Sequence, residues 1–214
     1  MQIDVVSDTV CPWCFIGKRR LDRAVAQRPD LAIEVNWRPY QLDPNVPKEG
    51  IDRKEYFRAK FGDGERVKGM SDTLRQYGEE LGIAFAFDKA DKRPNTIDSH
   101  RLIRWASSVG VQDAVVEALF KAYFEEGRDI GDAAVLTEIA AACGMDAELV
   151  AELLASEADI ELVTRESGMA GQMGIQGVPA FVLQGKYMLV GAQDTDVLVR
   201  VFDKVQAKDA AAAG

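Results

Sequence analysis

The 214-residue sequence has only three cysteines and one histidine, which limits both disulfide and metal chemistry. Three cysteines cannot build the disulfide framework of a small secreted domain. A structural zinc site normally needs four nitrogen or sulfur ligands, and beside Cys11 and Cys14 only Cys143 and His100 are available. We therefore expect no metal site.

Basic residues and long apolar runs are also scarce. The 26 Lys and Arg are outnumbered by 35 Asp and Glu, and the resulting net charge of -9 argues against nucleic-acid binding, which needs a basic surface. No apolar run approaches the roughly 20 residues of a transmembrane helix, so no membrane partner is expected. Residues 1–4 lead directly into a predicted strand without a basic region or cleavage site, so we expect no signal peptide and a cytoplasmic location.

Two of the cysteines lie close together near the amino terminus, in the run Cys11-Pro12-Trp13-Cys14. The β-branched residues at 3–6 are typical of a buried strand. Pro12 suits the first position of a helix, where its missing N–H would have no partner anyway. Cys11 is thus predicted at a helix N-terminus, where unpaired N–H groups and the helix dipole favour a thiolate. This arrangement favours thiol–disulfide redox chemistry.

Strands are predicted at both ends of the chain. The strand at 3–6, a helix that begins at Pro12 and an alternating strand at 31–37 give a βαβ unit with a right-handed crossover. Near the other end, strands at 178–183 and 187–190 flank a hairpin turn, and an amphipathic helix follows them.

The order βαβ, helical block, ββα predicts an α/β protein with a thioredoxin-like fold and a large insertion. Residues 1–41 and 175–207 would form the thioredoxin-like domain. Residues 42–174 would form an inserted all-helical domain, apart from a brief extended piece at 83–87, and 208–214 a frayed tail. The active site is expected in the groove between the two domains.

Four segments carry motifs in a recognisable order, at residues 10–19, 37–42, 94–102 and 177–181. Together they resemble the FrnE-like branch of the DsbA family. The resemblance implies a thioredoxin fold with a helical insertion and thiol–disulfide oxidoreductase activity. It also implies that Cys11 is the attacking thiol, Cys14 the resolving thiol and Pro179 a cis-proline facing them.

The substrates are expected to be disulfide-containing proteins or peptides, with glutathione as a possible electron donor and no other cofactor. In a reducing cytosol the Cys11–Cys14 pair would rest reduced, which suits reduction or isomerisation of disulfides. The wider superfamily is similar to glutathione-dependent 2-hydroxychromene-2-carboxylate isomerases and kappa-class transferases, which usually lack the intact thiol pair. A glutathione-dependent isomerase or transferase of a small aromatic compound remains an alternative, as does a holdase-like module that binds peptides.

Several residues around the thiols are candidates for supporting roles. The backbone of Val178 could pair with an extended substrate, and Trp13 is expected to be partly exposed. Asp8 could accept a proton from Cys14, or simply form a turn.

Other residues are candidates for binding substrate. His100 could activate a thiol, although a packed or capping histidine is the simpler interpretation. Asn95 resembles a position near the ligand in glutathione-using relatives, but helix capping explains it equally well. Tyr40, with Trp13, Phe57 and Phe61, could line an apolar cleft or belong to the core.

Overall fold

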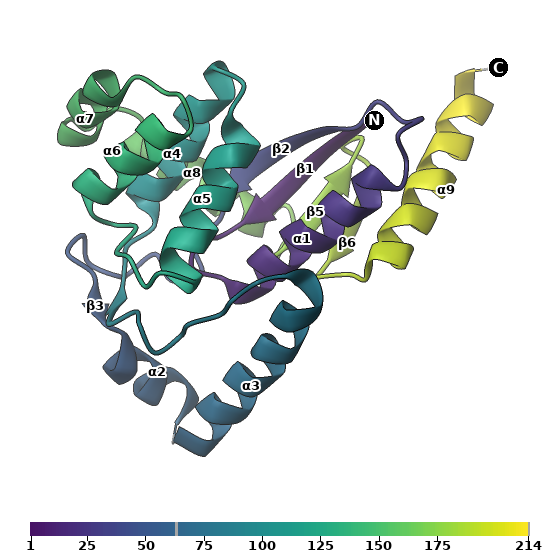
Figure 1. Cartoon of the computed structure of the whole chain (residues 1–214). Coiled ribbons are helices and arrows are strands. Elements are labelled where there is room, and N and C mark those ends of the chain that lie inside the picture. Colours follow the sequence, from purple (N-terminus) through teal and green to yellow (C-terminus); the bar gives the residue numbers. More distant parts are fainter. Residues whose placement is uncertain (63, 214) are drawn as a thin grey trace.

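The computed structural model describes residues 1–62 and 64–213 and is built on a four-stranded sheet with the order β2-β1-β5-β6 (Figure 1). Strands β1 (Gln2–Ser7) and β2 (Glu34–Pro39) are parallel and are joined by helix α1 (Pro12–Ala26). Strand β5 (Ala180–Leu183) is antiparallel to β1, and β6 (Tyr187–Val190) is antiparallel to β5. This topology confirms the predicted thioredoxin-like arrangement.

Helices cover both faces of the sheet. Successive strand residues point to opposite faces, so Val5 packs into the main core whereas Val6 packs into a smaller cluster with Ala170 of helix α8 (Ile160–Gln172). Helix α1 packs on the first face beside helix α9 (Thr195–Ala213). The buried positions of α9, which are Leu198, Phe202 and Val205, follow the helical period.

The segment between β2 and β5 is mainly helical. Besides α8 it contains α2 (Arg53–Phe61), α3 (Gly64–Leu81), α4 (Ile97–Ser108), α5 (Gln112–Phe124), α6 (Ala133–Ala142) and α7 (Ala147–Ala155). No helix in the described ranges has the length and apolar character needed to cross a bilayer.

One detail of the predicted insertion is wrong. It is not all-helical, because β3 (Ile51–Asp52) pairs antiparallel with β4 (Lys92–Arg93). Strands of two residues are too short to show an alternating pattern in the sequence. The piece expected to be extended at 83–87 lies outside helices, and its Ile83, Phe85 and Phe87 side chains are buried.

The frayed tail predicted at 208–214 is also wrong for residues 208–213, which continue helix α9, while residue 214 lies outside the described part of the chain. Alanine is the strongest helix former, so the alanine-rich end extends the helix. The side chain of Asp209 also accepts a hydrogen bond from Gln184 Nε2 at 3.0 Å, which ties this end of α9 to the β5–β6 turn.

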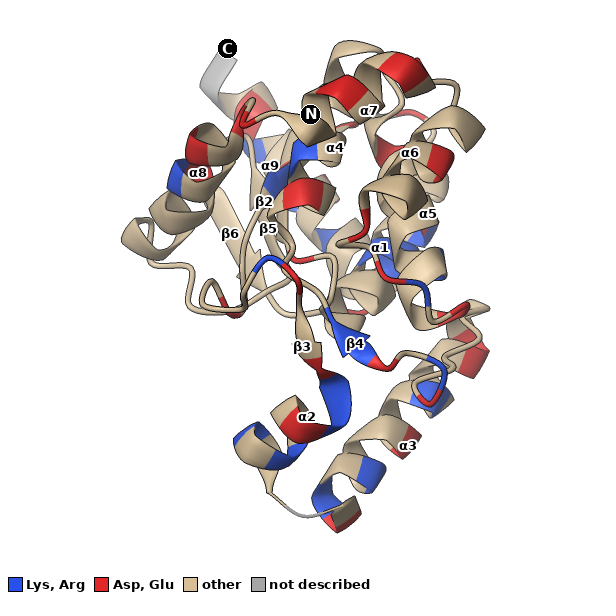
Figure 2. Ribbon diagram, turned by 90° about the vertical axis from the view of Figure 1, so that its left-hand side faces the viewer, with Lys and Arg blue, Asp and Glu red and all other residues tan. Residues whose placement is uncertain are grey.

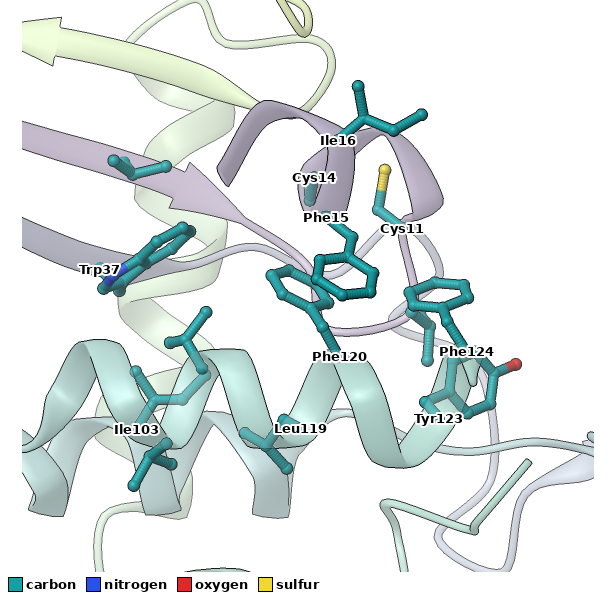
Figure 3. Packing of buried hydrophobic residues seen from close by; sticks show 14 of the residues in the cluster. Cys11, Cys14, Phe15, Ile16, Trp37, Ile103, Leu119, Phe120, Tyr123 and Phe124 are labelled. Atoms are coloured by element: carbon teal, nitrogen blue, oxygen red, sulfur yellow. The ribbon is translucent and has the colours of Figure 1, made fainter. Parts of the chain in front are cut away.

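The sheet and the helical segment share one aromatic core, shown in Figure 3. Phe15 of α1 stacks on Phe120 of α5, with 5.1 Å between ring centroids, and lies 6.2 Å from Phe124. Trp37 of β2 meets the edge of Phe120 at 6.4 Å. The domain boundaries predicted at residues 42 and 174 fall outside helices and strands, and the division itself stays a prediction.

Arg101 is fully buried within the helical segment. Its guanidinium donates hydrogen bonds to the carbonyls of Leu153, Ser156 and Ala158 at 2.6–2.9 Å, which end helix α7 and begin the next loop. It also pairs with Asp98 at 2.7 Å. A buried arginine thus satisfies carbonyls that a helix end leaves unpaired.

Replacing Arg101 by Met should lower the free energy of unfolding by about 3–5 kcal/mol, because it leaves the part-buried Asp98 carboxylate without its ion pair and removes the side-chain hydrogen bonds to the Ser156 and Ala158 carbonyls. Urea denaturation followed by circular dichroism measures this loss. Arg104→Met is the matched control, since Arg104 is exposed and pairs with Glu166 at the surface, and it should cost less than about 1 kcal/mol. Equal losses of unfolding free energy in the two variants would show that the hydrogen bonds from Arg101 to the end of α7 contribute little to stability.

Candidate active site

The two cysteines lie on the first turn of α1, as the sequence predicts. Cys11 is the N-cap residue, with extended backbone angles, and Pro12 follows at the first helical position. The Cys11 carbonyl accepts hydrogen bonds from the amides of Cys14 at 3.0 Å and Phe15 at 3.4 Å. Both thiols are unbonded; Cys14 is fully buried and Cys11 is 4% exposed.

The loop before β5 faces Cys11. The Val178–Pro179 peptide bond is cis, as expected from the sequence, and the Val178 carbonyl accepts a hydrogen bond from Cys11 Sγ at 3.7 Å. Pairing of Val6 with Ala180 holds this loop beside the turn that joins β1 to α1. The two segments are about 170 residues apart in the chain, and the β1–β5 ladder brings them together.

Gly17 allows α1 to approach this loop closely. A Cβ atom at Gly17 would lie 2.8 Å from Pro179 Cγ and 3.3 Å from Phe181 Cζ. Both distances are shorter than ordinary van der Waals contacts, so a side chain here would displace the loop from the thiols.

The surroundings of Cys14 keep it protonated. Burial raises the pKa of the Cys14 thiol well above its ordinary value, and the neighbouring Cys11 raises it further. Hydrogen bonds from the Ser7 side chain and the Asp8 backbone to the Cys14 sulfur act in the opposite direction on this pKa. The two thiols therefore occupy different environments although they are three residues apart.

Asp8 is fully buried in a polar cluster behind the thiols. Its Oδ2 accepts a hydrogen bond from the Leu42 amide at 2.8 Å, and its Oδ1 lies 3.5 Å from His100 Nε2. That nitrogen is also 3.0 Å from the Tyr40 carbonyl, which only accepts, so Nε2 carries the proton. A role for Asp8 as proton acceptor for Cys14 stays a prediction.

A cavity of about 290 Å³ opens beside Cys11, between the thioredoxin-like layer and the helical segment. Trp13 borders it and is 37% exposed, as expected. Val178, Phe57 and Phe61 also line it, whereas Tyr40 does not. The remaining lining residues are mostly apolar and come from α1, α2, α3, β4, α5 and the neighbouring loops: Val10, Pro12, Leu42, Arg53, Tyr56, Lys60, Val67, Met70, Ser71, Leu74, Phe87, Arg93, Tyr123, Phe124 and Gly177.

Two other predicted binding residues also lie outside this cavity. Asn95 donates to the Val46 carbonyl at 2.6 Å and accepts from the Ile97 amide at 2.9 Å, so its side chain caps α4. His100 borders a separate cavity of about 340 Å³ beside Arg104. Of the four residues predicted to bind substrate, only Val178 lies on the cavity beside Cys11, and the roles of the others stay predictions.

Sequence reasoning missed the cationic side chains on the cavity wall, which are Arg53, Lys60 and Arg93. Arg53 and Arg93 are 40 residues apart, and the two-residue strands that align them leave no pattern in the sequence. Across residues 1–62 and 64–213, no group of three or more His, Cys, Asp or Glu could hold a metal ion.

The family model described as the DSBA-like thioredoxin domain matches residues 2–203. The chain belongs to this family. Among solved structures, the probable DsbA oxidoreductase SCO1869 from Streptomyces coelicolor is 32% identical, covers 97% of this chain and 90% of its own, and superposes with a TM-score of 0.89. Members of the DSBA-like family act as oxidoreductases or isomerases, which agrees with a free thiol pair beside a cavity.

Two more distant solved structures share the fold. A 2-hydroxychromene-2-carboxylate isomerase is 16% identical over all of both chains, with a TM-score of 0.74. The cytosolic disulfide reductase DsbM from Pseudomonas aeruginosa, solved with glutathione, is 19% identical over 97% of this chain and 100% of its own, with a TM-score of 0.67. The fold alone is thus shared by a disulfide reductase and an isomerase.

Gly17→Ala should displace the Val178–Pro179 loop and slow disulfide exchange at Cys11, while lowering the free energy of unfolding by about 1–3 kcal/mol through overpacking. Urea denaturation and the rate of insulin reduction measure the two effects. Gly168→Ala, in α8 with open space around it, is the control and should stabilise the helix by up to about 1 kcal/mol. If Gly17→Ala behaved like the control, the close approach of α1 to the Val178–Pro179 loop would not be needed for stability or for disulfide exchange.

The raised pKa of Cys14 also predicts a pH dependence. Above about pH 8.5, where an ordinary thiol ionises, the unfolded state loses this proton while the folded state keeps it. The free energy of unfolding of the reduced protein should therefore fall with rising pH, with a contribution from Cys14 of up to about 1.4 kcal/mol per pH unit. Denaturation between pH 7 and 9.5 should show a shallower slope in Cys14→Ala; equal slopes would contradict a buried protonated thiol.

Proposed function

We propose that this protein is a thiol–disulfide oxidoreductase that reduces or isomerises disulfides of proteins through Cys11 and Cys14. The observation that carries the proposal is the asymmetry of the thiol pair. Cys11 borders the cavity and faces the Val178 carbonyl, whereas Cys14 is fully buried one turn along α1. One thiol is therefore placed to meet a substrate, and the other only to meet Cys11.

The exchange proceeds in two steps. The Cys11 thiolate attacks one sulfur of the substrate disulfide, that S–S bond breaks, and the leaving sulfur takes the electron pair and then a proton. Cys14 next gives up its proton and attacks Cys11 Sγ, which releases the second substrate thiol. The substrate gains two electrons and two protons, and the protein holds a Cys11–Cys14 disulfide. A thiol donor of the glutathione class would return the pair to the dithiol.

The backbone beside Cys11 suits an extended substrate. Within the described chain, the Val178 amide has no hydrogen-bond partner and the Val178 carbonyl accepts only from Cys11. A substrate strand that pairs with Val178 would hold its sulfur close to Cys11, which supplies orientation. In this proposal Pro179 shapes the loop, while Pro12 and Trp13 present Cys11 at the helix N-terminus.

The FrnE-like branch and a cytoplasmic location are part of the same proposal. The four motifs at residues 10–19, 37–42, 94–102 and 177–181 support the first, and the structural similarity to a reductase described as cytosolic supports the second. In a reducing compartment the dithiol would persist, which favours reduction or isomerisation over net oxidation.

A glutathione-dependent isomerase is the second candidate function. The cavity volume of about 290 Å³ and its aromatic walls at Phe57 and Phe61 would suit a small aromatic compound. That chemistry needs one activating site for glutathione and no second thiol. The requirement for Cys14 therefore distinguishes the two functions.

Cys14→Ser should trap a mixed disulfide between Cys11 and a peptide substrate, because nothing remains to resolve it, and should reduce insulin at no more than a few per cent of the wild-type rate. Cys11→Ser should form no adduct and have no activity. Insulin reduction and mass spectrometry measure both effects.

Cys143→Ser is the matched control and should keep wild-type activity, since Cys143 lies at the end of α6, away from the cavity wall. Full turnover without Cys14 would favour the isomerase. Peptide binding that survives Cys11→Ser, with no turnover in the wild type, would favour a holdase.

A further inference from the structure

Arg93 is a buried cation that has no carboxylate partner among the described residues. It is 5% exposed, at the end of β4, and borders the cavity beside Cys11. Its guanidinium lies over the Tyr56 ring, 4.7 Å from the centroid, but its buried Nε has no hydrogen-bond partner. Within residues 1–62 and 64–213 its side chain forms no ion pair with a carboxylate. Buried arginines normally form ion pairs with carboxylates, so the Arg93 guanidinium is a candidate binding site for an anionic ligand.

A second arginine lies beside it. Arg93 pairs with Ile51 in the β3–β4 sheet, and Arg53 follows at the start of α2, with its amide bonded to the Asp91 carbonyl at 2.9 Å. Arg53 Nη1 donates to the Phe87 carbonyl at 2.8 Å. The basic segments at β4 and the start of α2 are adjacent in Figure 2. The short sheet therefore aligns two guanidinium groups on one wall.

The charged side chains described on this wall are cations. Lys60 also borders the cavity, and its Nζ donates to Tyr56 Oη at 2.6 Å. Among residues 1–62 and 64–213, no Asp or Glu lines this cavity, although the whole chain has a net charge of -9. Positive charge is thus concentrated at the cavity beside Cys11, and apolar walls screen it less than water would.

The pKa of the Tyr123 phenol depends on the charges of the same two arginines. It borders the cavity and is 3% exposed. Burial raises the pKa of its phenol, while the charges of Arg53 and Arg93 act to lower it. Both guanidinium groups are therefore close enough to influence an anion formed inside the cavity.

We propose that Arg93 and Arg53 form a subsite that binds a carboxylate. This inference rests on the proposed function, and it means that the substrates of Cys11 are disulfides or thiols with a carboxylate near the sulfur. A guanidinium donates two parallel hydrogen bonds to a carboxylate, and this pairing neutralises the buried charge of Arg93. The aromatic wall at Phe57 and Phe61 packs against the carbon chain. The carboxylate comes from a small acidic thiol such as glutathione or from an acidic residue beside a protein cysteine.

The test compares the rates at which dithiodiglycolate, neutral hydroxyethyl disulfide and cationic cystamine oxidise the reduced Cys11–Cys14 pair, each divided by its rate with dithiothreitol. The wild type should favour dithiodiglycolate over cystamine by at least about tenfold at low salt, and added salt should reduce this preference. Arg93→Gln should lower the preference by about tenfold, the effect of one lost charge-assisted contact. Arg93→Lys should retain part of it, because the charge remains.

Arg58→Gln is the matched control, since Arg58 is exposed on α2 and does not border the cavity. It should leave the preference unchanged, and circular dichroism verifies that each variant is folded. Equal preferences in wild type and Arg93→Gln, or a wild-type preference that salt leaves unchanged, would overturn the subsite. Failure of all three disulfides to oxidise the pair would instead reject the proposed function.

A second set of substrates separates the two sources of the carboxylate. Glutathione disulfide is compared with two peptide disulfides that carry Glu or Lys beside the cysteine. An effect of Arg93→Gln confined to glutathione disulfide assigns the subsite to small thiols, and an effect on the Glu peptide assigns it to acidic proteins. No effect on either overturns the proposal.

Discussion

The contact between Phe15 and helix α5 fixes the geometry of the active site. Phe15 follows Cys14 directly, and its ring stacks on Phe120 with 5.1 Å between centroids. Phe124, one turn further along α5, belongs to the same cluster and also borders the cavity. The helix that carries the thiols is therefore packed against the helical segment that forms the opposite wall. The cavity exists because one aromatic core joins the two parts of the fold.

Charge is distributed unequally across this site. Asp8 is buried behind the thiols beside His100, whereas Arg53 and Arg93 lie on the cavity wall in front of them. If the proposed carboxylate subsite holds, a negatively charged substrate group would meet cations on the cavity wall and lie away from the buried Asp8 carboxylate. Such a substrate would take one orientation, with its carboxylate at Arg53 and Arg93 and its sulfur towards Cys11.

Residue patterns alone predict the parts of the site that depend on local structure. The family resemblance adds the cis peptide bond at Pro179 beside Cys11, and neither predicts the cations on the cavity wall. Pro12 marks the start of α1, and from that one position the places of both thiols follow. Asn95 illustrates the limit, because both ends of its amide are used by neighbouring backbone groups and it does not reach the cavity beside Cys11. Arg93 was overlooked because its burial comes from a two-residue strand pairing, which has no sequence period.

The environment of Cys14 links its reactivity to the state of Cys11. Burial and the neighbouring Cys11 raise the pKa of the Cys14 thiol, whereas Ser7 and the Asp8 backbone act to lower it. In the proposed exchange, a bond between Cys11 Sγ and a substrate sulfur removes the Coulombic contribution of Cys11 to the raised pKa of Cys14. Burial, the largest cause, still raises this pKa, and the hydrogen bonds from Ser7 and the Asp8 backbone still act to lower it. Formation of the mixed disulfide thus eases ionisation of the resolving thiol in part, and the buried position of Cys14 still opposes it.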